Sequence, residues 1–269
     1  MLNKDTQLCI SLSGRPSNIG TRFHNYLYQK LALDFIYKAF STDDIEHAIK
    51  GVRALQIRGC SVSMPFKESC IPFIDTLSDS VKAIDSVNTI VNDKGHLTAY
   101  NTDYIAVKDL IDLNFKDKQQ RVLIQGSGGM AKAVIAAFRD SGFRDVVIAA
   151  RNQQQGQALA DKYHYRWQST PEGVTADILV NVTPIGMSGG AEQDQLAFSE
   201  PAIAAATFVF DVVAFPAETP LIQRARQLNK TVVTGAEVIA LQALEQFALY
   251  TGVRPDHALM LEASAWSRA

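Results

Sequence analysis

The chain has 269 residues, of which 47% are hydrophobic and 20% charged, and its formal net charge is −2. This length can form one large domain or two modest ones with a buried core, and the scattered basic residues exclude a nucleic-acid or membrane surface. No apolar run approaches the ~18 residues of a membrane span, and the N-terminus lacks the apolar core of a signal peptide. We expect a globular protein, either a monomer or a homodimer.

Three cysteines, Cys9, Cys60 and Cys70, lie in the first third of the chain. Their odd number does not suggest a disulfide framework, and their spacing is not that of a zinc site. We therefore expect buried thiols, no bound metal and a cytoplasmic location.

Strands alternate with helices in the first hundred residues, which favours a parallel or mixed α/β sheet. We predict strands at residues 7–12, 34–40, 56–63, 84–91 and 96–103. The first helix should be capped by Thr21 and the second should open at 42–44, because hydroxyl and carboxylate side chains accept hydrogen bonds from the first helical amides. The turn at 92–95 has the composition of a hairpin.

The second part of the chain begins after a helix predicted at 104–113 and again alternates strands and helices. We predict strands at residues 121–125, 145–149, 177–182, 207–213 and 231–233. Helices should follow at residues 130–141, 153–165, 219–228, 237–250 and 256–266. Because the last two helices are too few to form a domain, we expect them to return to the first lobe.

A glycine-rich turn joins the strand at 121–125 to the helix that follows it. The turn contains Gly126, Ser127, Gly128 and Gly129, and Met130 and Ala131 open the helix. Glycines let a pyrophosphate approach backbone N–H groups at the positive end of a helix, where larger side chains would block it. Because the turn also precedes a second buried strand, it predicts a dinucleotide site.

The residue that follows the second strand of this unit indicates which dinucleotide binds. An NAD site usually has a carboxylate there for the ribose 2′-hydroxyl, but this chain has Arg151 and no carboxylate before Asp161. The planar, permanently charged guanidinium suits a 2′-phosphate. We therefore expect NADP.

Several segments resemble the shikimate dehydrogenase family, in order and over nearly the whole chain. They are SVSMPFKE at 61–68, SVNT at 86–89, NTD at 101–103, GSGGMAKA at 126–133, NVTPIGM at 181–187, DVV at 211–213, ETPLI at 218–222 and Gly235 with Gln242-Ala243. The resemblance implies an α/β substrate lobe with a mixed sheet, formed by residues 1–104 and 237–269. It also implies a Rossmann-type NADP-binding lobe at 105–236, and oxidation of the 3-hydroxyl of shikimate.

The resemblance also implies roles for individual residues. Lys67 and Asp103 would be the catalytic pair, because the hydroxyl proton must leave as hydride leaves the carbinol carbon. Asn88 and Gln242 would bind the ring hydroxyls of the substrate. Thr183, Met187 and Gly235 would border the cofactor.

The sequence departs from the family where the substrate carboxylate should bind. Two serines of the family pattern S-x-S-P are replaced by Asn18 and Gly20, and its proline by Thr21. We expect Asn18 and Thr21 to face the substrate instead, and Ser11, Ser13 and Ser17 are the other side chains that could replace the lost serines. Ala214 replaces a tyrosine, and Phe66 and Ala150 replace a histidine and an asparagine.

These departures favour an NADP-dependent oxidoreductase acting on shikimate or a related polyhydroxylated ring acid. Each lost hydrogen bond to a carboxylate costs about 1.5–3 kcal/mol, so shikimate should bind weakly. Two alternatives stay open. One is a true biosynthetic shikimate dehydrogenase with a rearranged loop, and the other is a catalytically quiet NADP-binding regulatory protein.

Overall fold

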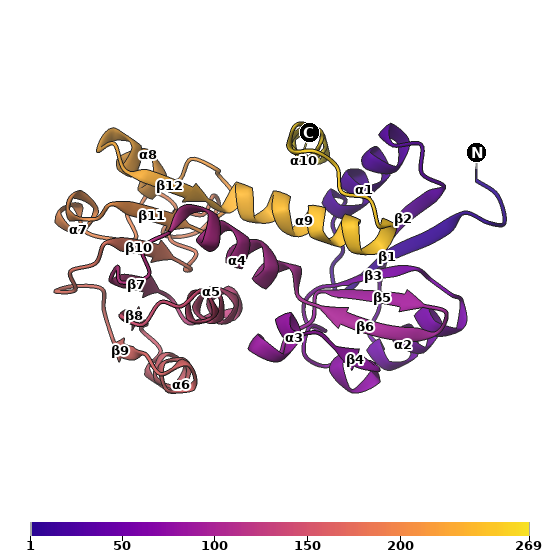
Figure 1. Ribbon diagram of the computed structural model, residues 1–269, viewed down its shortest axis with the longest axis horizontal. Coiled ribbons are helices and arrows are strands. Elements are labelled where there is room, and N and C mark those ends of the chain that lie inside the picture. The colour runs from indigo at the N-terminus through magenta and orange to yellow at the C-terminus, as the bar shows by residue number, and fades with distance from the viewer. Residues whose placement is uncertain (1, 269) are drawn as a thin grey trace. The chain divides into compact units, whose positions relative to one another are not determined.

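The computed structural model describes residues 2–268, which form two compact units (Figure 1). The first unit comprises the described residues up to Thr102 together with those from Ala240 onward, and the second is Asp103–Ile239. Within the described part of the chain, no helix is long and apolar enough to cross a membrane.

The first unit is built on a mixed sheet. Its strands are β1 (Gln7–Ser13), β2 (Phe35–Ser41), β3 (Gly59–Val62), β4 (Thr76–Leu77), β5 (Thr89–Asp93) and β6 (His96–Tyr100). Its helices are α1 (Ile19–Lys30), α2 (Ile45–Ala54), the 3-10 turn η1 (Ile71–Phe73), α3 (Asp79–Ile84) and α10 (His257–Arg268). The order is β2-β1-β3-β5-β6-β4, in which β5 runs antiparallel to both neighbours. This arrangement confirms the predicted mixed sheet.

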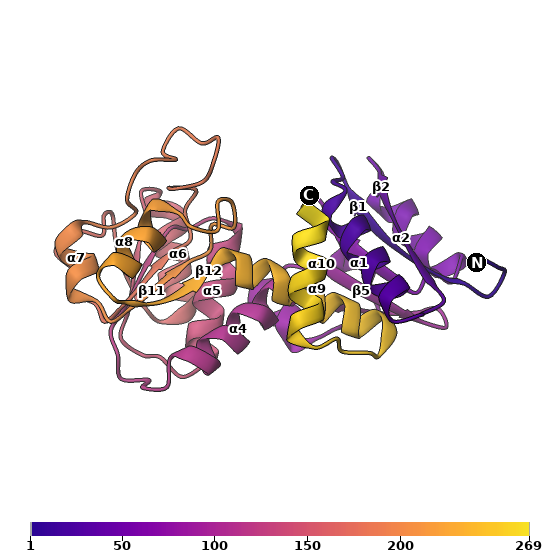
Figure 2. The same cartoon turned by 90° about the horizontal axis from the view of Figure 1, so that it is seen from above.

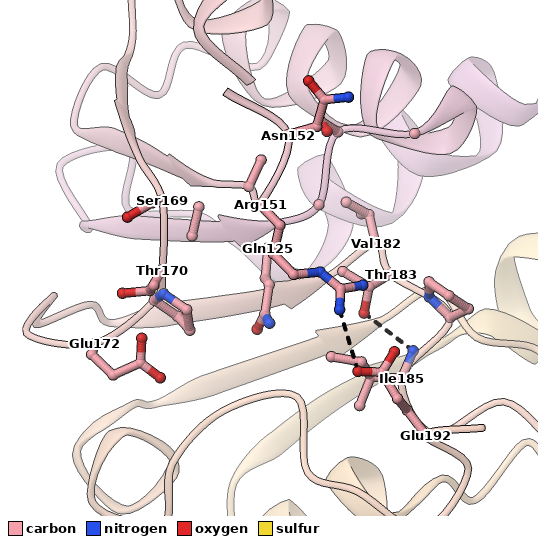
Figure 3. Close-up of a pocket in the computed structure, with 17 residues that line it drawn as sticks. Gln125, Arg151, Asn152, Ser169, Thr170, Glu172, Val182, Thr183, Ile185 and Glu192 are labelled. Carbon is pink, nitrogen blue, oxygen red and sulfur yellow. Dashed lines mark hydrogen bonds and ion pairs between the residues drawn. The ribbon is translucent and has the colours of Figure 1, made fainter. Parts of the chain in front are cut away.

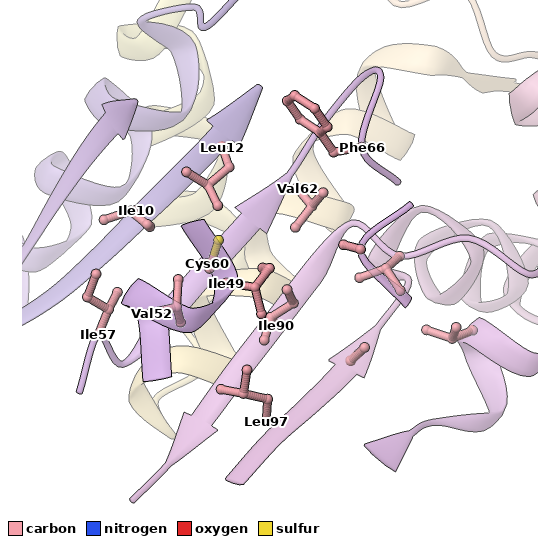
Figure 4. Close-up of a cluster of buried hydrophobic side chains, with 14 residues drawn as sticks. Ile10, Leu12, Ile49, Val52, Ile57, Cys60, Val62, Phe66, Ile90 and Leu97 are labelled. Carbon is pink, nitrogen blue, oxygen red and sulfur yellow. The ribbon is translucent and has the colours of Figure 1, made fainter. Parts of the chain in front are cut away.

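Alternation along the strands gives this sheet two apolar faces. On one face Ile10 and Ile90 pack with Ile49 of α2 (Figure 4). The adjacent residues Cys9 and Val91 point to the other face, where a second cluster includes residues of α1, α9 (Gly235–Thr251) and α10. Figures 1 and 2 both show α10 beside α1. The terminal helices therefore return to the first unit, as the sequence predicts.

The second unit has a wholly parallel sheet. Its strands are β7 (Val122–Gln125), β8 (Val146–Ala149), β9 (Arg166–Gln168), β10 (Ile178–Asn181), β11 (Phe208–Asp211) and β12 (Thr231–Thr234). Its helices are α4 (Thr102–Asn114), α5 (Gly129–Asp140), α6 (Gln153–Tyr163), α7 (Glu200–Ala205) and α8 (Pro220–Gln227). The order β12-β11-β10-β7-β8-β9 is the doubly wound Rossmann order.

Several boundaries differ from the sequence prediction for local reasons. Helix α1 begins at Ile19, because the Arg22 amide already donates to the Asn18 carbonyl at 2.9 Å, so the prediction of Thr21 as its cap was wrong. Strand β11 ends at Asp211, whose carboxylate accepts from the Val213 amide and turns the chain. The short elements η1, α3, β4, β9 and α7 were not predicted, because their two to six residues are too short to show a period.

Gly59 of β3 should tolerate no side chain. A Cβ there would overlap the ring of Tyr250, which is fully buried on α9, whereas a Cβ at Gly51 of α2 would meet no atom within 4 Å. We expect Gly59→Ala to lower the free energy of unfolding by about 1–3 kcal/mol through overpacking. Gly51→Ala is the matched control and should raise it by about 0.5–1 kcal/mol. Urea unfolding of both variants checks this, and equal effects would contradict the packing.

Candidate active site

A cavity of about 460 Å³ opens at the carboxyl ends of β7, β8 and β10 (Figure 3). The strand order reverses between β7 and β10, so the loops that follow them diverge and leave a crevice. The lining residues are Gln125, Gly126, Ser127, Gly128, Ala149, Ala150, Arg151, Asn152, Ser169, Thr170, Pro171, Glu172, Val182, Thr183, Pro184, Ile185 and Glu192. The sequence predicts five of them as cofactor-binding residues.

The glycine turn forms one wall of this cavity. Gly126 has φ +126°, and a Cβ on it would lie 2.9 Å from Cγ2 of Val182, so only glycine fits. Gly128 is the N-cap of the 12-residue helix α5, and a Cβ there would meet no atom within 4 Å. Exposed backbone at a helix N-terminus is therefore available to the phosphates of a dinucleotide.

Four more of the predicted cofactor residues occupy two places. Gly129, Met130 and Ala131 form the first turn of α5. Thr183 lines the cavity, and its hydroxyl donates to Asn181 at 2.6 Å and accepts from the Ile185 amide at 3.2 Å.

Met187 and Gly235 do not line the cavity. Met187 is 41% exposed on the same loop as Thr183, whereas a Cβ on Gly235 would overlap the backbone of Val212 and Val213. Gly235 therefore permits close packing at the start of α9.

At the predicted 2′-phosphate position, Arg151 extends along the cavity with a 79% exposed side chain. Its Nη1 lies 3.5 Å from Oε1 of Glu192, which is 30% exposed (Figure 3). Glu172 adds a second carboxylate to the lining, and hydrogen bonds from the Thr170 side chain and its own backbone lower its pKa. Neither glutamate was predicted, because both stand in irregular loops without a recognisable motif.

Behind the cavity a fully buried carboxylate joins three segments of the second unit. Asp211 accepts from the Thr219 hydroxyl at 2.6 Å, and from the Val213 amide and Asn181 Nδ2, both at 3.0 Å. Asn181 in turn accepts from the Thr183 amide and hydroxyl. Burial raises the pKa of Asp211 to about 6, although these three hydrogen bonds act in the opposite direction.

In the first unit, two predicted substrate ligands share one hydrogen-bond network. The buried Asn88 donates to the Thr102 hydroxyl at 3.0 Å and accepts from the Thr102 amide at 2.8 Å. The Thr102 hydroxyl also lies 3.3 Å from Oε1 of Gln242. Asn88 has a second amide hydrogen, so the network retains a donor for a ligand.

The two predicted catalytic residues belong to different units. Lys67 is half-buried in the turn after β3, where its carbonyl accepts from the Val87 amide at 2.7 Å. Asp103 is half-buried in the first turn of α4, immediately after Thr102, which Asn88 anchors.

The residues predicted at the substrate carboxylate lie at the end of β1 and at the start of α1. Asn18 is exposed at the start of α1 and its side chain makes no capping bond. The hydroxyls of Thr21 and Ser13 are buried, and neither has a hydrogen-bond partner within the described residues. Phe66 is buried in the apolar cluster of Figure 4, and Ala214 is half-buried.

Comparison with known proteins places this geometry in a family. Residues 18–90 match the model of the shikimate dehydrogenase substrate binding domain, and residues 109–180 match the shikimate / quinate 5-dehydrogenase model. A shikimate dehydrogenase-like protein of Haemophilus influenzae is 61% identical over 268 residues, which are 100% of this chain and 99% of the relative.

Two further relatives agree. The NADP(+) shikimate dehydrogenase of Pyrococcus abyssi is 32% identical over 94% of this chain and 96% of its own. A solved shikimate 5-dehydrogenase-like protein has 60% identity and a TM-score of 0.99, with both chains fully covered.

The raised pKa of Asp211 predicts a pH dependence of stability. Its folded pKa of about 6 exceeds the ordinary value of 3.8, so folding favours proton uptake between these values. Relative to Asp211→Asn, which cannot titrate, the parent protein should gain up to about 3 kcal/mol of unfolding free energy as the pH falls from 7 to 4. Urea unfolding across this range measures the difference, and a constant or falling difference would show that Asp211 is not desolvated.

Proposed function

The chain belongs to the shikimate dehydrogenase family, and from this premise we propose that it is an NADP-dependent oxidoreductase. Its substrate would be shikimate or a related polyhydroxylated ring acid, of which it oxidises a ring secondary alcohol reversibly. The observation that carries the proposal is the glycine-lined cavity at the reversal of a doubly wound sheet, with Arg151 at its rim.

The cavity residues suit the cofactor in two ways. The backbone of Gly126–Gly128, at the positive end of α5, can receive the pyrophosphate, and Arg151 can receive the 2′-phosphate. The name of the Pyrococcus relative specifies NADP(+), which supports the same assignment. When bound, NADP supplies the acceptor for the hydride.

The remaining chemistry falls to the protein. As the C–H bond of the carbinol breaks with transfer of hydride, the hydroxyl proton must pass to a base, and it returns in the reverse reaction. We assign this proton to Lys67 together with Asp103. Asn88 and Gln242 would hold the ring hydroxyls, and their shared hydrogen bonds with Thr102 fix their orientation.

The carboxylate end of the substrate is where this chain should differ from shikimate dehydrogenases. Asn18 and Thr21 stand in place of the pattern's first serine and its proline, and Ala214 offers no phenolic hydroxyl. Thr21 remains our candidate for a new polar contact, because its hydroxyl lacks a partner among the described residues. We propose that a ring acid with a different arrangement around its carboxylate is the preferred substrate.

Lys67→Ala tests the reaction. Initial rates of NADP reduction with shikimate and with quinate should fall about 10²–10⁴-fold, as expected for loss of a general acid–base group. Lys82→Ala, which removes an exposed lysine from α3 of the same unit, is the matched control and should keep the parental rate.

The outcomes distinguish a biosynthetic enzyme, an enzyme for a different ring acid and a regulatory protein. Fast, Lys67-dependent shikimate turnover would identify a biosynthetic enzyme whose loop has rebuilt a carboxylate site. Slow but Lys67-dependent turnover would support a different ring acid. A rate that survives Lys67→Ala would refute the catalytic assignment, and NADP binding without turnover of any ring acid would favour a regulatory protein.

A further inference from the structure

Among the described residues that line the cavity, Arg151 is the only one with a permanent positive charge, and it already pairs with a carboxylate. Arg151 lies 3.5 Å from the Glu192 carboxylate, and the two side chains come from different loops of the sheet's carboxyl edge (Figure 3). A 2′-phosphate carries up to two negative charges and would seek the same guanidinium. The Glu192 carboxylate and the 2′-phosphate would therefore compete for the guanidinium of Arg151.

The negative charge of Glu192 makes this competition consequential. Of the two carboxylates in the cavity lining, Glu192 is the one that pairs with Arg151. A 2′-phosphate bound at Arg151 would stand close to the Glu192 carboxylate, and like charges in proximity repel. NAD, which has a neutral 2′-hydroxyl, meets no such repulsion.

The position of Glu192 is built into the loop that carries it. Its backbone carbonyl accepts from the Gly186 amide at 3.0 Å and from the Gln195 amide at 3.2 Å, and Gly186 has φ +86°. The same loop is tied to the next one by the Ser188 amide, which donates to the Phe215 carbonyl at 2.9 Å. These bonds hold the Glu192 backbone in place, and from there its carboxylate reaches to 3.5 Å from Nη1 of Arg151.

We propose that Glu192 is a specificity-determining residue that competes with the 2′-phosphate of NADP for Arg151 and so narrows the preference for NADP over NAD. The inference rests on the proposed use of a nicotinamide dinucleotide at this cavity. It adds that NADP binds by displacing an internal carboxylate, whereas NAD leaves the Arg151–Glu192 pair intact.

Equilibrium binding tests this without any substrate. Dissociation constants for NADP and NAD are measured by calorimetry on the parent protein, Glu192→Gln, Arg151→Ala and the double variant. Glu192→Gln keeps the size of the side chain and removes its charge, so NADP should bind about 3- to 10-fold more tightly while NAD changes by less than about 2-fold. In the Arg151→Ala background the same substitution should have little effect on the ratio of the two constants.

Glu172→Gln is the matched control, because it removes an equal charge from the same cavity without touching the partner of Arg151. The NADP to NAD ratio should change by less than about 2-fold, since a screened, exposed charge acts weakly at a distance. Equal effects of the two glutamine variants, or an effect of Glu192→Gln that persists without Arg151, would overturn the proposal.

Failure of the inference and failure of the proposed reaction are distinguishable. If the ratio of the dissociation constants shifts as predicted but no ring acid is turned over, only the dehydrogenase assignment is refuted. If turnover depends on Lys67 but the ratio of the dissociation constants is unchanged in Glu192→Gln, only the role of Glu192 is refuted. Absence of binding of either nucleotide to the parent protein would overturn both.

Discussion

The contact between Gly126 and Val182 fixes where the cavity of the second unit can open. These residues follow β7 and β10, the neighbouring strands between which the order of the sheet reverses, and no Cβ fits between them. The chain can then turn sharply out of β7 and start α5 with unobstructed backbone N–H groups. The phosphate-binding surface thus depends on one close backbone approach, and the remaining cavity residues are arranged around it.

Asp211 shows how a costly buried group can order this site. An ionised carboxylate without solvent is unfavourable, yet its hydrogen bonds join the ends of β10 and β11 to the N-terminus of α8 through Asn181 and Thr219. Asn181 then holds Thr183 in the cavity wall. An apolar residue could fill the same volume, but it could not fix the loops at these positions.

Much of the architecture could be predicted from the sequence, because long strands and helices have periods that local residues reveal. Both sheets, the glycine turn and the place of Arg151 just after β8 follow from such patterns. Glu192 could not be predicted, since a loop of irregular backbone bonds brings it to Arg151 across many residues. Thr21 was misassigned as a helix cap because a backbone hydrogen bond from the Arg22 amide to the Asn18 carbonyl starts the helix earlier. A backbone bond of this kind cannot be predicted from the pattern of side chains.

The residues proposed for the ring hydroxyls of the substrate and those proposed for its carboxylate differ in how well they are oriented by hydrogen bonds. The proposed ligands of the ring hydroxyls are pre-oriented, since Asn88 and Gln242 are both linked to Thr102, and Asp103 follows in the sequence. The proposed carboxylate end instead offers an exposed Asn18 and the buried hydroxyls of Ser13 and Thr21, which have no hydrogen-bond partner in the part of the chain that the structure describes. An unpaired buried hydroxyl costs about 1–3 kcal/mol, which a suitable ligand group could recover. We therefore expect selectivity among ring acids to be decided at this end of the substrate, because the groups proposed to hold the oxidised alcohol would serve any related ring acid.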